Sequence, residues 1–301
     1  MTEVAILSGK GGTGKSGVSA ALASLAAKVV VADCDVDAAN LHLILQPDDY
    51  REEVYISGQK ARIDTDKCIN CGICASYCRF DAINKTANSY SIVETACDGC
   101  KLCSRVCPNG AITMVEQNKS RWFVGDIING KMVHARLAPG EDNSGKLVNI
   151  VRDNARREAH DIQSDLIIID GPPGIGCPVI STLSGINKVL LVTEPSLSGL
   201  HDLKRIVELI SQYKLQVFLV INKWDINPEI SDEIERWSRE KQIPVISKIP
   251  FSKLWVEAMI NCKSIVDWAP ESDLSDEIRT IWNYLMKNEP KPERYNTHSG
   301  Q

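Results

Sequence analysis

The sequence lacks the features of several classes of protein. None of its apolar runs approaches the roughly 18 to 20 consecutive residues that span a bilayer, and its start lacks the basic, apolar and small-residue order of a signal peptide. Positive charge is not in excess, because 34 Lys and Arg face 39 Asp and Glu, a formal net charge of −5. This balance disfavours a general nucleic-acid binder. We therefore expect a cytoplasmic protein with no membrane and no nucleic-acid partner.

Aromatic residues are scarce at 6%, but 44% hydrophobic residues in a chain of 301 allow roughly two domains with a sizeable core. Cysteine, in contrast, is abundant. Eight of the eleven cysteines lie between residues 68 and 107. In a chain without a secretion signal, such a cluster indicates a metal site before it indicates disulfides.

Much of the chain alternates short apolar runs with helical patterns. EVAILSG (3–9) and VVVADCD (29–35) flank a Gly-rich turn and an Ala-rich helical segment over 15–28. This order predicts a βαβ unit of a parallel sheet. Near-continuous apolar runs predict four more strands, each covered on both faces, at 165–171, 188–194, 215–222 and 243–249, with helical patterns at 200–213 and 228–241. The sequence thus predicts an α/β fold with a doubly wound, mainly parallel sheet.

Between about residues 50 and 140 this alternation stops. The four-cysteine run that begins at Cys68 recurs 29 residues later at Cys97. Asn129-Gly130 then suits the tight turn of a hairpin, and the helical pattern over 144–160 leads back to the α/β core. We predict a discontinuous α/β domain over 1–50 and 141–289, an inserted domain over 58–116, a hairpin return over 117–140 and a disordered tail over 290–301.

The first turn carries a phosphate-binding motif. Residues 9–16, GKGGTGKS, match G-x-x-x-x-G-K-S between a predicted strand and a predicted helix. Glycines let backbone N–H groups converge on phosphate oxygens, Lys15 places charge at the β- and γ-phosphates, and the Ser16 hydroxyl ligates Mg²⁺. The start of the helix adds its positive dipole end. The predicted Mg-nucleotide site comprises Gly9, Lys10, Gly11, Gly12, Thr13, Gly14, Lys15, Ser16 and Gly17.

The cysteine repeat is the C-x₂-C-x₂-C-x₃-C pattern of two-cluster ferredoxins, in which the fourth cysteine of each run ligates the other cluster. Zinc fits less well, because zinc ribbons show separated C-x₂-C pairs. Arg79 departs from the pattern, since it replaces the proline that follows the fourth cysteine. Its charge and its backbone donor would raise the reduction potential nearby, unless it is a plain surface residue. The predicted ligands of one 4Fe–4S cluster are Cys68, Cys71, Cys74 and Cys107, and those of the other are Cys97, Cys100, Cys103 and Cys78.

With its extra Lys10, KGGTGKS resembles the phosphate loop of the MinD/ParA/nitrogenase-iron-protein class of ATPases. By that resemblance, Lys10 reaches across a dimer interface to the partner's nucleotide. ADCDVDAANLHL places Asp35 at the family's first switch, where a carboxylate orients the attacking water. DLIIIDGPPG places Asp170 as the Walker B acid that holds Mg²⁺ through water. The implied catalytic set is Lys10, Lys15, Asp35 and Asp170, whereas Asp33 and Asp37 suit capping or surface positions better.

Residues at the end of another predicted strand suggest which purine base the site binds. Asn222, Lys223 and Asp225 form an N-K-x-D string, which reads guanine in small GTPases. In the resembled ATPase class a lone Asn at this strand end contacts adenine. Because the loop carries Lys10, we favour ATP, with Asn222 at the base, and keep guanine as the alternative.

From residue 3 to about 288 the chain resembles MinD-superfamily ATPases with an inserted ferredoxin domain, and LAPGEDNSGKLV, DGPPGIGCPVI and IPFSKLWVEAM fit as well. This implies a Mg-ATP-hydrolysing dimer, of identical chains or with a related chain, whose ATP state gates electron transfer through two 4Fe–4S clusters to a redox protein. The alternative is an ATPase that delivers clusters or a metallocofactor to an acceptor protein. A MinD/ParA-like positioning ATPase with a redox sensor is less favoured.

Two further features bear on these alternatives. The last helical pattern, ESDLSDEIRTIWNYLMKNE, is acidic on its polar face, so we expect it to pack against the sheet and not on a membrane. Cys177 follows Asp170 at a spacing comparable to that of a shared cluster ligand in the nitrogenase iron protein. The sequence shows no obvious second thiol to complete such a bridge, and the role of Cys177 stays open.

Overall fold

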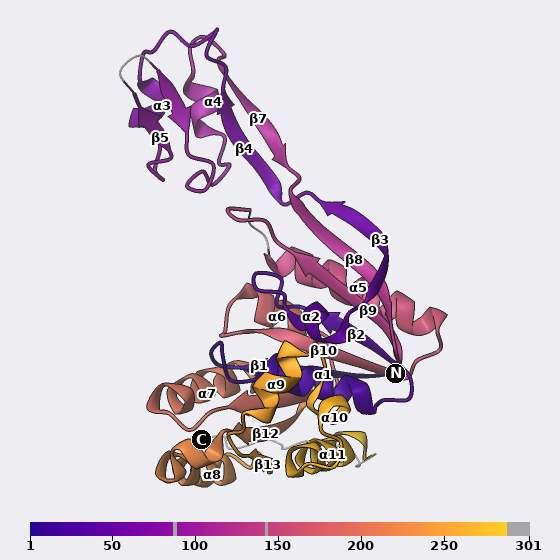
Figure 1. The fold of residues 1–301 in the computed structure, drawn as a ribbon. Helices are drawn as coiled ribbons and strands as arrows, with labels where there is room; N and C mark the ends of the chain where they lie inside the picture. Colours follow the sequence, from indigo (N-terminus) through magenta and orange to yellow (C-terminus); the bar gives the residue numbers. More distant parts are fainter. Residues whose placement is uncertain (87–88, 142–143, 288–301) are drawn as a thin grey trace, which may run out of the picture.

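A computed structural model describes residues 1–86, 89–141 and 144–287 of the chain. The predicted disordered tail over 290–301 lies outside these residues. Within them, one sheet of nine strands forms the body of the molecule, and a smaller lobe projects from it on paired strands (Figure 1).

Parallel strands make up most of the large sheet. Their spatial order is β13 (Val245–Ile249), β12 (Gln216–Asn222), β11 (Lys188–Thr193), β1 (Thr2–Ser8), β10 (Leu166–Pro173), β2 (Val29–Asp33) and β9 (Gly130–Arg136). Two antiparallel strands, β8 (Ser120–Ile127) and β3 (Asp48–Tyr55), extend the β9 edge. The α/β sheet that the apolar runs predict is confirmed, and the hairpin predicted over 117–140 lies within it as β8 and β9.

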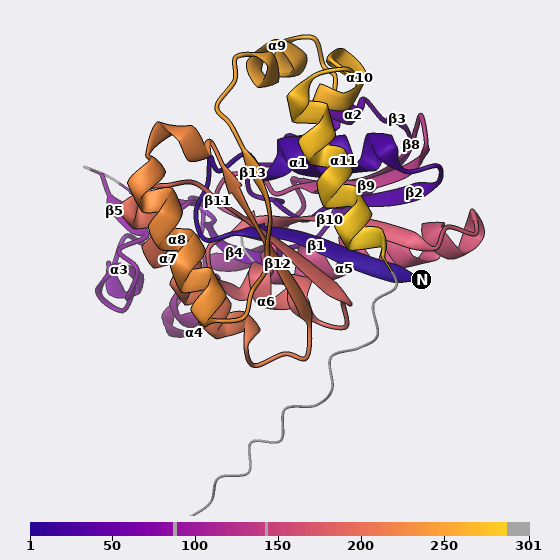
Figure 2. The ribbon, with the colours of Figure 1, turned by 90° about the horizontal axis from the view of Figure 1, so that it is seen from below.

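Helices cover both faces of this sheet, as strands buried on both sides require (Figure 2). One face carries α5 (Ser144–Asp161), α6 (Cys177–Leu183), α7 (Leu197–Ile210) and α8 (Pro228–Glu240). The other carries α1 (Lys15–Leu25), α2 (Leu41–Leu45), α9 (Leu254–Ile260), α10 (Ile265–Trp268) and α11 (Asp273–Met286). A short 3₁₀ turn, η1, spans Trp224–Ile226. The two hydrophobic cores therefore lie above and below the strands.

The last described helix, α11, packs on the sheet as its pattern predicts. Its apolar stripe is buried at Leu274, Ile278, Ile281 and Leu285, and Ser272 caps its N-terminus by accepting a hydrogen bond from the Ser275 N–H. In the described part of the chain, no helix combines the length and the apolar character that crossing a bilayer demands.

The projecting lobe, residues 58–117, is named here the cysteine lobe. Its frame is the antiparallel pair β4 (Gly58–Ile63) and β7 (Ile112–Gln117), which continues the β3–β8 pair outward from the body (Figure 1). The rest consists of α3 (Ile73–Ser76), β5 (Ile83–Lys85), β6 (Tyr90–Ile92) and α4 (Leu102–Val106). Its buried apolar cluster is small, with Ala61, Cys74 and Ile112 at its centre. Burial of apolar area therefore contributes little to the stability of this lobe.

Candidate functional site

The predicted phosphate loop lies at the carboxyl end of β1, near the middle of the sheet. The loop runs from the end of β1 to Gly14, and α1 begins at Lys15. Gly12 and Gly14 have φ angles of 79° and 90°, a left-handed conformation that disfavours other residues. A Cβ on Gly14 would lie 2.3 Å from the Asn222 amide nitrogen. The glycines therefore allow both the turn and the close approach of Asn222 at the end of β12.

Lys15 and Ser16 meet Asp170 inside the site. The Lys15 ammonium lies 3.1 Å from an Asp170 carboxylate oxygen and 3.7 Å from Asp35. The Ser16 hydroxyl donates to the other Asp170 oxygen at 2.7 Å. Burial lowers the pKa of Lys15, but the nearby charges of Asp170, Asp35 and Asp33 outweigh it and raise that pKa. The arrangement joins a cation for phosphate, a hydroxyl for Mg²⁺ and a fully buried carboxylate.

Ser19 is a further partner of Asp170. Because Ser19 lies outside the phosphate-binding motif, the motif does not predict this contact. Its hydroxyl donates to Asp170 at 2.8 Å and lies one helical turn after Lys15. The spacing of four residues on a helix places the two side chains on one face, which is the signal that could have found it.

The three acidic residues after β2 differ in their surroundings. Asp33 is 1% exposed and accepts hydrogen bonds from the backbone N–H groups of Asp35 and Leu41, so it shapes the loop that leads to α2. Burial raises the pKa of Asp33. Asp35 points to Lys15, and burial raises its pKa while Lys15 opposes the shift. Burial also raises the pKa of Asp37.

Lys10 is held within its own chain in this structure. Its ammonium lies 2.6 Å from Glu194, and it donates to the Ser196 and Ser198 hydroxyls at 3.1 and 3.0 Å. Glu194, which follows β11, also lies 3.4 Å from the Lys223 ammonium. Burial raises the pKa of Glu194, but the two lysines outweigh it and keep the pKa below its ordinary value. Sequence reasoning missed Glu194, although it stands at the same carboxyl edge of the sheet.

The end of β12 supports the phosphate loop from behind. The Asn222 side chain donates to the Thr13 carbonyl at 2.7 Å, and the Lys223 ammonium donates to the Gly12 carbonyl at 3.1 Å. Asp225 accepts a hydrogen bond from the Phe251 N–H at 2.6 Å. The Asn222 side chain therefore contacts the loop in this structure, whereas its contact with adenine stays a prediction.

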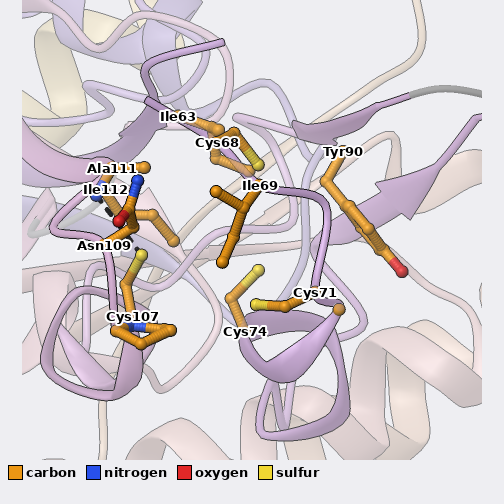
Figure 3. A pocket seen from close by; sticks show the side chains of 12 residues that line it. Ile63, Cys68, Ile69, Cys71, Cys74, Tyr90, Cys107, Asn109, Ala111 and Ile112 are labelled. Atoms are coloured by element: carbon orange, nitrogen blue, oxygen red, sulfur yellow. Dashed lines mark hydrogen bonds between the residues drawn. The ribbon is translucent and has the colours of Figure 1, made fainter. Parts of the chain in front are cut away.

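The eight clustered cysteines divide between two cavities, each of about 360 Å³ including its open mouth. Each cavity takes three cysteines from one run and the fourth from the other run. Figure 3 shows the first cavity, where the four cysteine side chains point toward one region that the Ile69 side chain also enters. The Ala111 N–H donates to the Cys107 sulfur at 3.3 Å. The first cavity is lined by Cys68, Cys71, Cys74 and Cys107, and the second by Cys78, Cys97, Cys100 and Cys103.

The two halves of the cysteine lobe also repeat one another in backbone shape. Three positions with left-handed φ angles, Asn70, Gly72 and Asp81, recur 29 residues later at Gly99, Lys101 and Gly110. The repeat of the sequence is thus a repeat of structure, with one half supplying the fourth cysteine of the other. All eleven cysteines are free thiols, and Cys177 is exposed at the start of α6. Among the described residues, no three His, Cys, Asp or Glu side chains are placed to hold a single metal ion.

Comparisons with known proteins identify the family. Residues 4–265 match the family model of the CobQ/CobB/MinD/ParA nucleotide-binding domain, and the chain belongs to this family. It is 35% identical to the uncharacterized protein MJ0578 of Methanocaldococcus jannaschii, over 95% of this chain and 96% of that protein.

Two further likenesses concern the fold and the lobe. The MinD protein of Pyrococcus horikoshii, solved with Mg-ADP, has a TM-score of 0.59 at 19% identity and covers 95% of this chain and 96% of its own. This likeness shows the shared fold. A ferredoxin of Thermococcus litoralis is 37% identical over 57 residues, which cover 18% of this chain and 97% of the ferredoxin.

Proposed function

We propose that this protein is a Mg-ATP-hydrolysing switch whose nucleotide state gates electron transfer through two 4Fe–4S clusters in the cysteine lobe. The observation that carries the proposal is the division of eight thiols into two cavities of four, on the same chain as a phosphate loop. The nucleotide-binding family is shown, and hydrolysis, the clusters and the electron partner are what we propose.

In the nucleotide site, we assign each side chain a separate task. Lys15 binds the β- and γ-phosphates, while Ser16 ligates Mg²⁺ and Asp170 orients its water. Asp35, 3.7 Å from Lys15, orients the attacking water next to the γ-phosphate. Since phosphoryl transfer depends on positioning and charge neutralisation, these groups suffice without a covalent intermediate.

In this proposal, Lys10 is the residue through which two subunits share a nucleotide site. Its ammonium would leave Glu194 and reach the nucleotide of a partner subunit, which is an identical or a related chain. Glu194 and the hydroxyls of Ser196 and Ser198 hold Lys10 in the single chain, so ATP-dependent dimerisation exchanges one set of partners for another.

In the cysteine lobe, the residues fit two clusters. The thiols are free, each cavity has apolar walls, and the lobe has a small apolar core of its own. A cluster has an iron at each of four corners, so its thiolates stand further apart than the ligands of one ion. When bound, such clusters supply one-electron storage, and their ligation supplies folding free energy.

The alternative function is delivery of clusters or a metallocofactor to an acceptor protein. One observation favours it: each cavity contains one exposed thiol, Cys71 in the first and Cys100 in the second, where an acceptor could attack. The similarity to MinD concerns the fold, so a positioning function gains no specific support from it.

Anaerobic purification with iron analysis and electron paramagnetic resonance tests the proposal. We expect about eight iron atoms per chain and two interacting reduced clusters. Cys74→Ser should disturb the clusters, whereas Cys34→Ser, outside both cavities, should keep the full iron content. Iron well below eight atoms per chain, with intact nucleotide binding, would overturn the two-cluster assignment. ATP turnover coupled to reduction of an acceptor supports gating, whereas transfer of iron to an apo-ferredoxin supports delivery.

A further inference from the structure

The junction between the cysteine lobe and the body contains two buried charged side chains that neither the phosphate loop nor the cysteine motif explains. We name this junction the neck, residues 56–60, 118–120 and 138–141. Lys60 is 5% exposed and Glu141 is 6% exposed. A buried charge is costly unless it is paired or well hydrogen-bonded, so these two residues need partners.

Glu141 ties the 138–141 loop to both strands of the neck. Its carboxylate accepts hydrogen bonds from the Ser57 hydroxyl at 3.1 Å, from the Lys119 N–H at 2.9 Å and from the Ser120 N–H at 3.2 Å. The Ser120 hydroxyl is another donor. Burial raises the pKa of Glu141, but these donors outweigh it and lower the pKa, so the group accepts as a carboxylate.

Lys60 ties the same loop to the second cysteine run. Its ammonium donates to the carbonyl of Glu94 at 2.5 Å and to the carbonyl of Gly140. A Cβ on Gly140 would lie 3.0 Å from the Thr95 side chain, so the loop and the segment before Cys97 are in direct contact. Lys60 thus links the lobe segment 94–97 to the 138–141 loop by hydrogen bonds.

The second cavity is the one nearer to this neck. Along the β4–β7 pair, Ala61 and Met114 line the second cavity, and Ile63 and Ile112 line the first. The first is therefore two residues further out, roughly 7 Å along the strands. Beside the first cavity, the Asn109 amide donates to the Lys67 carbonyl, a hydrogen bond that lies within the lobe.

Close packing also joins the second cavity to β4. Gly99 lies between Cys97 and Cys100, and a Cβ there would lie 2.1 Å from the Gln59 carbonyl oxygen. The cysteine loop of the second cavity therefore rests directly on the strand that leaves the neck.

On its other side, the neck leads to the nucleotide site. Glu141 precedes α5, which begins at Ser144, and a Cβ on Gly145 would lie 3.2 Å from the Ser181 hydroxyl and 3.5 Å from Cys177 in α6. The segment before α6 follows β10, which carries Asp170. A movement of this segment with the nucleotide would therefore press on the start of α5, which follows the 138–141 loop along the chain.

We propose that Lys60 and Glu141 are positioning residues that transmit the nucleotide state to the second cavity, so that the cluster at Cys78, Cys97, Cys100 and Cys103 responds to ATP and the cluster of the first cavity faces the external partner. This inference rests on the proposed function, because it needs both clusters. It adds the order in which the nucleotide state is transmitted: from the ATP site through the neck to the second cavity, and from there through the first cavity to the partner.

The test uses the full chain purified anaerobically with its clusters. Midpoint potentials of both clusters are measured with and without a non-hydrolysable Mg-ATP analogue, and the second cluster is identified by the signal that Cys100→Ser alters. We expect the analogue to move that cluster only. Coupled sites typically change each other's affinity by roughly 5- to 150-fold. A tenfold difference in analogue affinity between the oxidised and the reduced cluster corresponds to a shift in midpoint potential of about 59 mV.

Matched variants decide whether the neck carries the effect. Lys60→Met removes the ammonium, and Glu141→Gln removes two of the acceptor positions of the carboxylate. Each variant should reduce the coupling between nucleotide and cluster to less than about twofold, while iron content and analogue affinity persist. Lys60→Arg and Glu141→Asp should restore part of it. The exposed controls Lys85→Met and Glu116→Gln should keep the wild-type shift. Coupling that survives in both neck variants, or that acts on the first cluster, overturns the inference.

A second measurement needs no variant to fold. Hydrogen exchange of the wild-type chain should show Mg-ATP-dependent protection in 94–100 and 138–141 but not in 64–74. The reverse pattern, or no change in either region, also overturns the inference. Chains that bind no iron would instead refute the proposed function, so the two failures are distinct.

Discussion

Replacing Gly14 with alanine tests how the phosphate loop is built. Gly14 has a φ angle of 90°, and the added Cβ would lie 2.3 Å from the Asn222 amide nitrogen, which donates to Thr13. The left-handed conformation costs a non-glycine residue roughly 1–2 kcal/mol. Displacing Asn222 loses a hydrogen bond worth about 1 kcal/mol. We expect Gly14→Ala to weaken Mg-ATP binding by roughly 30- to 150-fold, from a total of about 2–3 kcal/mol.

Two neighbouring glycines separate these contributions. Gly12 has a φ angle of 79° with nothing within 4 Å of its Cβ position, so Gly12→Ala should show the strain alone, a loss of roughly 5- to 30-fold. Gly11 also has open space around it, and its φ angle lies outside the left-handed region. Gly11→Ala should stay within about twofold of the wild type.

The assay is calorimetric titration of each variant with Mg-ATP, with thermal unfolding as the check on folding. The double variant Gly14→Ala with Asn222→Ala should lose less affinity than the sum of the two single variants, because both remove the same contact. The reasoning is wrong if Gly14→Ala binds like Gly12→Ala, or if Gly11→Ala loses as much as Gly14→Ala.

Three further predictions follow from the site and its surroundings. Asp35→Ala should keep Mg-ATP affinity but slow hydrolysis by roughly 100-fold or more in a phosphate-release assay, and unchanged turnover would remove Asp35 from the mechanism. Burial lowers the pKa of the stacked rings of His42 and His134, so folding disfavours their protonation, and urea unfolding should show stability falling as the pH drops below about 6.5. In His134→Gln that slope should lessen, and an equal slope would contradict the assignment. Arg152→Met should cost about 3 kcal/mol in chemical unfolding, because it breaks a buried pair with Glu3 at 2.8 Å, and a loss under about 1 kcal/mol would refute this.

Local patterns predicted a large part of this molecule. Strand runs such as 165–171 are apolar because both faces of β10 are covered. Consecutive residues must then be mainly apolar, which is visible in the sequence. The glycine loop before Lys15 likewise needs residue types at fixed spacing. The α/β sheet and the family membership are confirmed. The lobe's two four-thiol cavities match the predicted sets of cysteines, whereas the clusters themselves stay a prediction.

The partners that polar and charged side chains have within the folded chain could not be predicted in this way. The resemblance assigns Lys10 to a partner's nucleotide, which stays a prediction, and in the single chain Lys10 contacts Glu194, 184 residues later in the sequence. The contact of Asn222 with the base stays a prediction, and in this structure its amide donates to the Thr13 carbonyl of the phosphate loop. Both contacts join the ends of different parallel strands, so no periodicity along the chain records them.

By itself, then, the sequence determined the strands, the phosphate loop and the pairing of cysteine runs, because each depends on residues close together or on a repeat with a fixed offset. Only the tertiary structure decided that the hairpin joins the large sheet, that Lys60 and Glu141 are buried in the neck, and that the second cavity lies nearer to the body. These features depend on which surfaces meet after the chain folds. Burial and hydrogen bonding between distant segments leave no local pattern in the sequence.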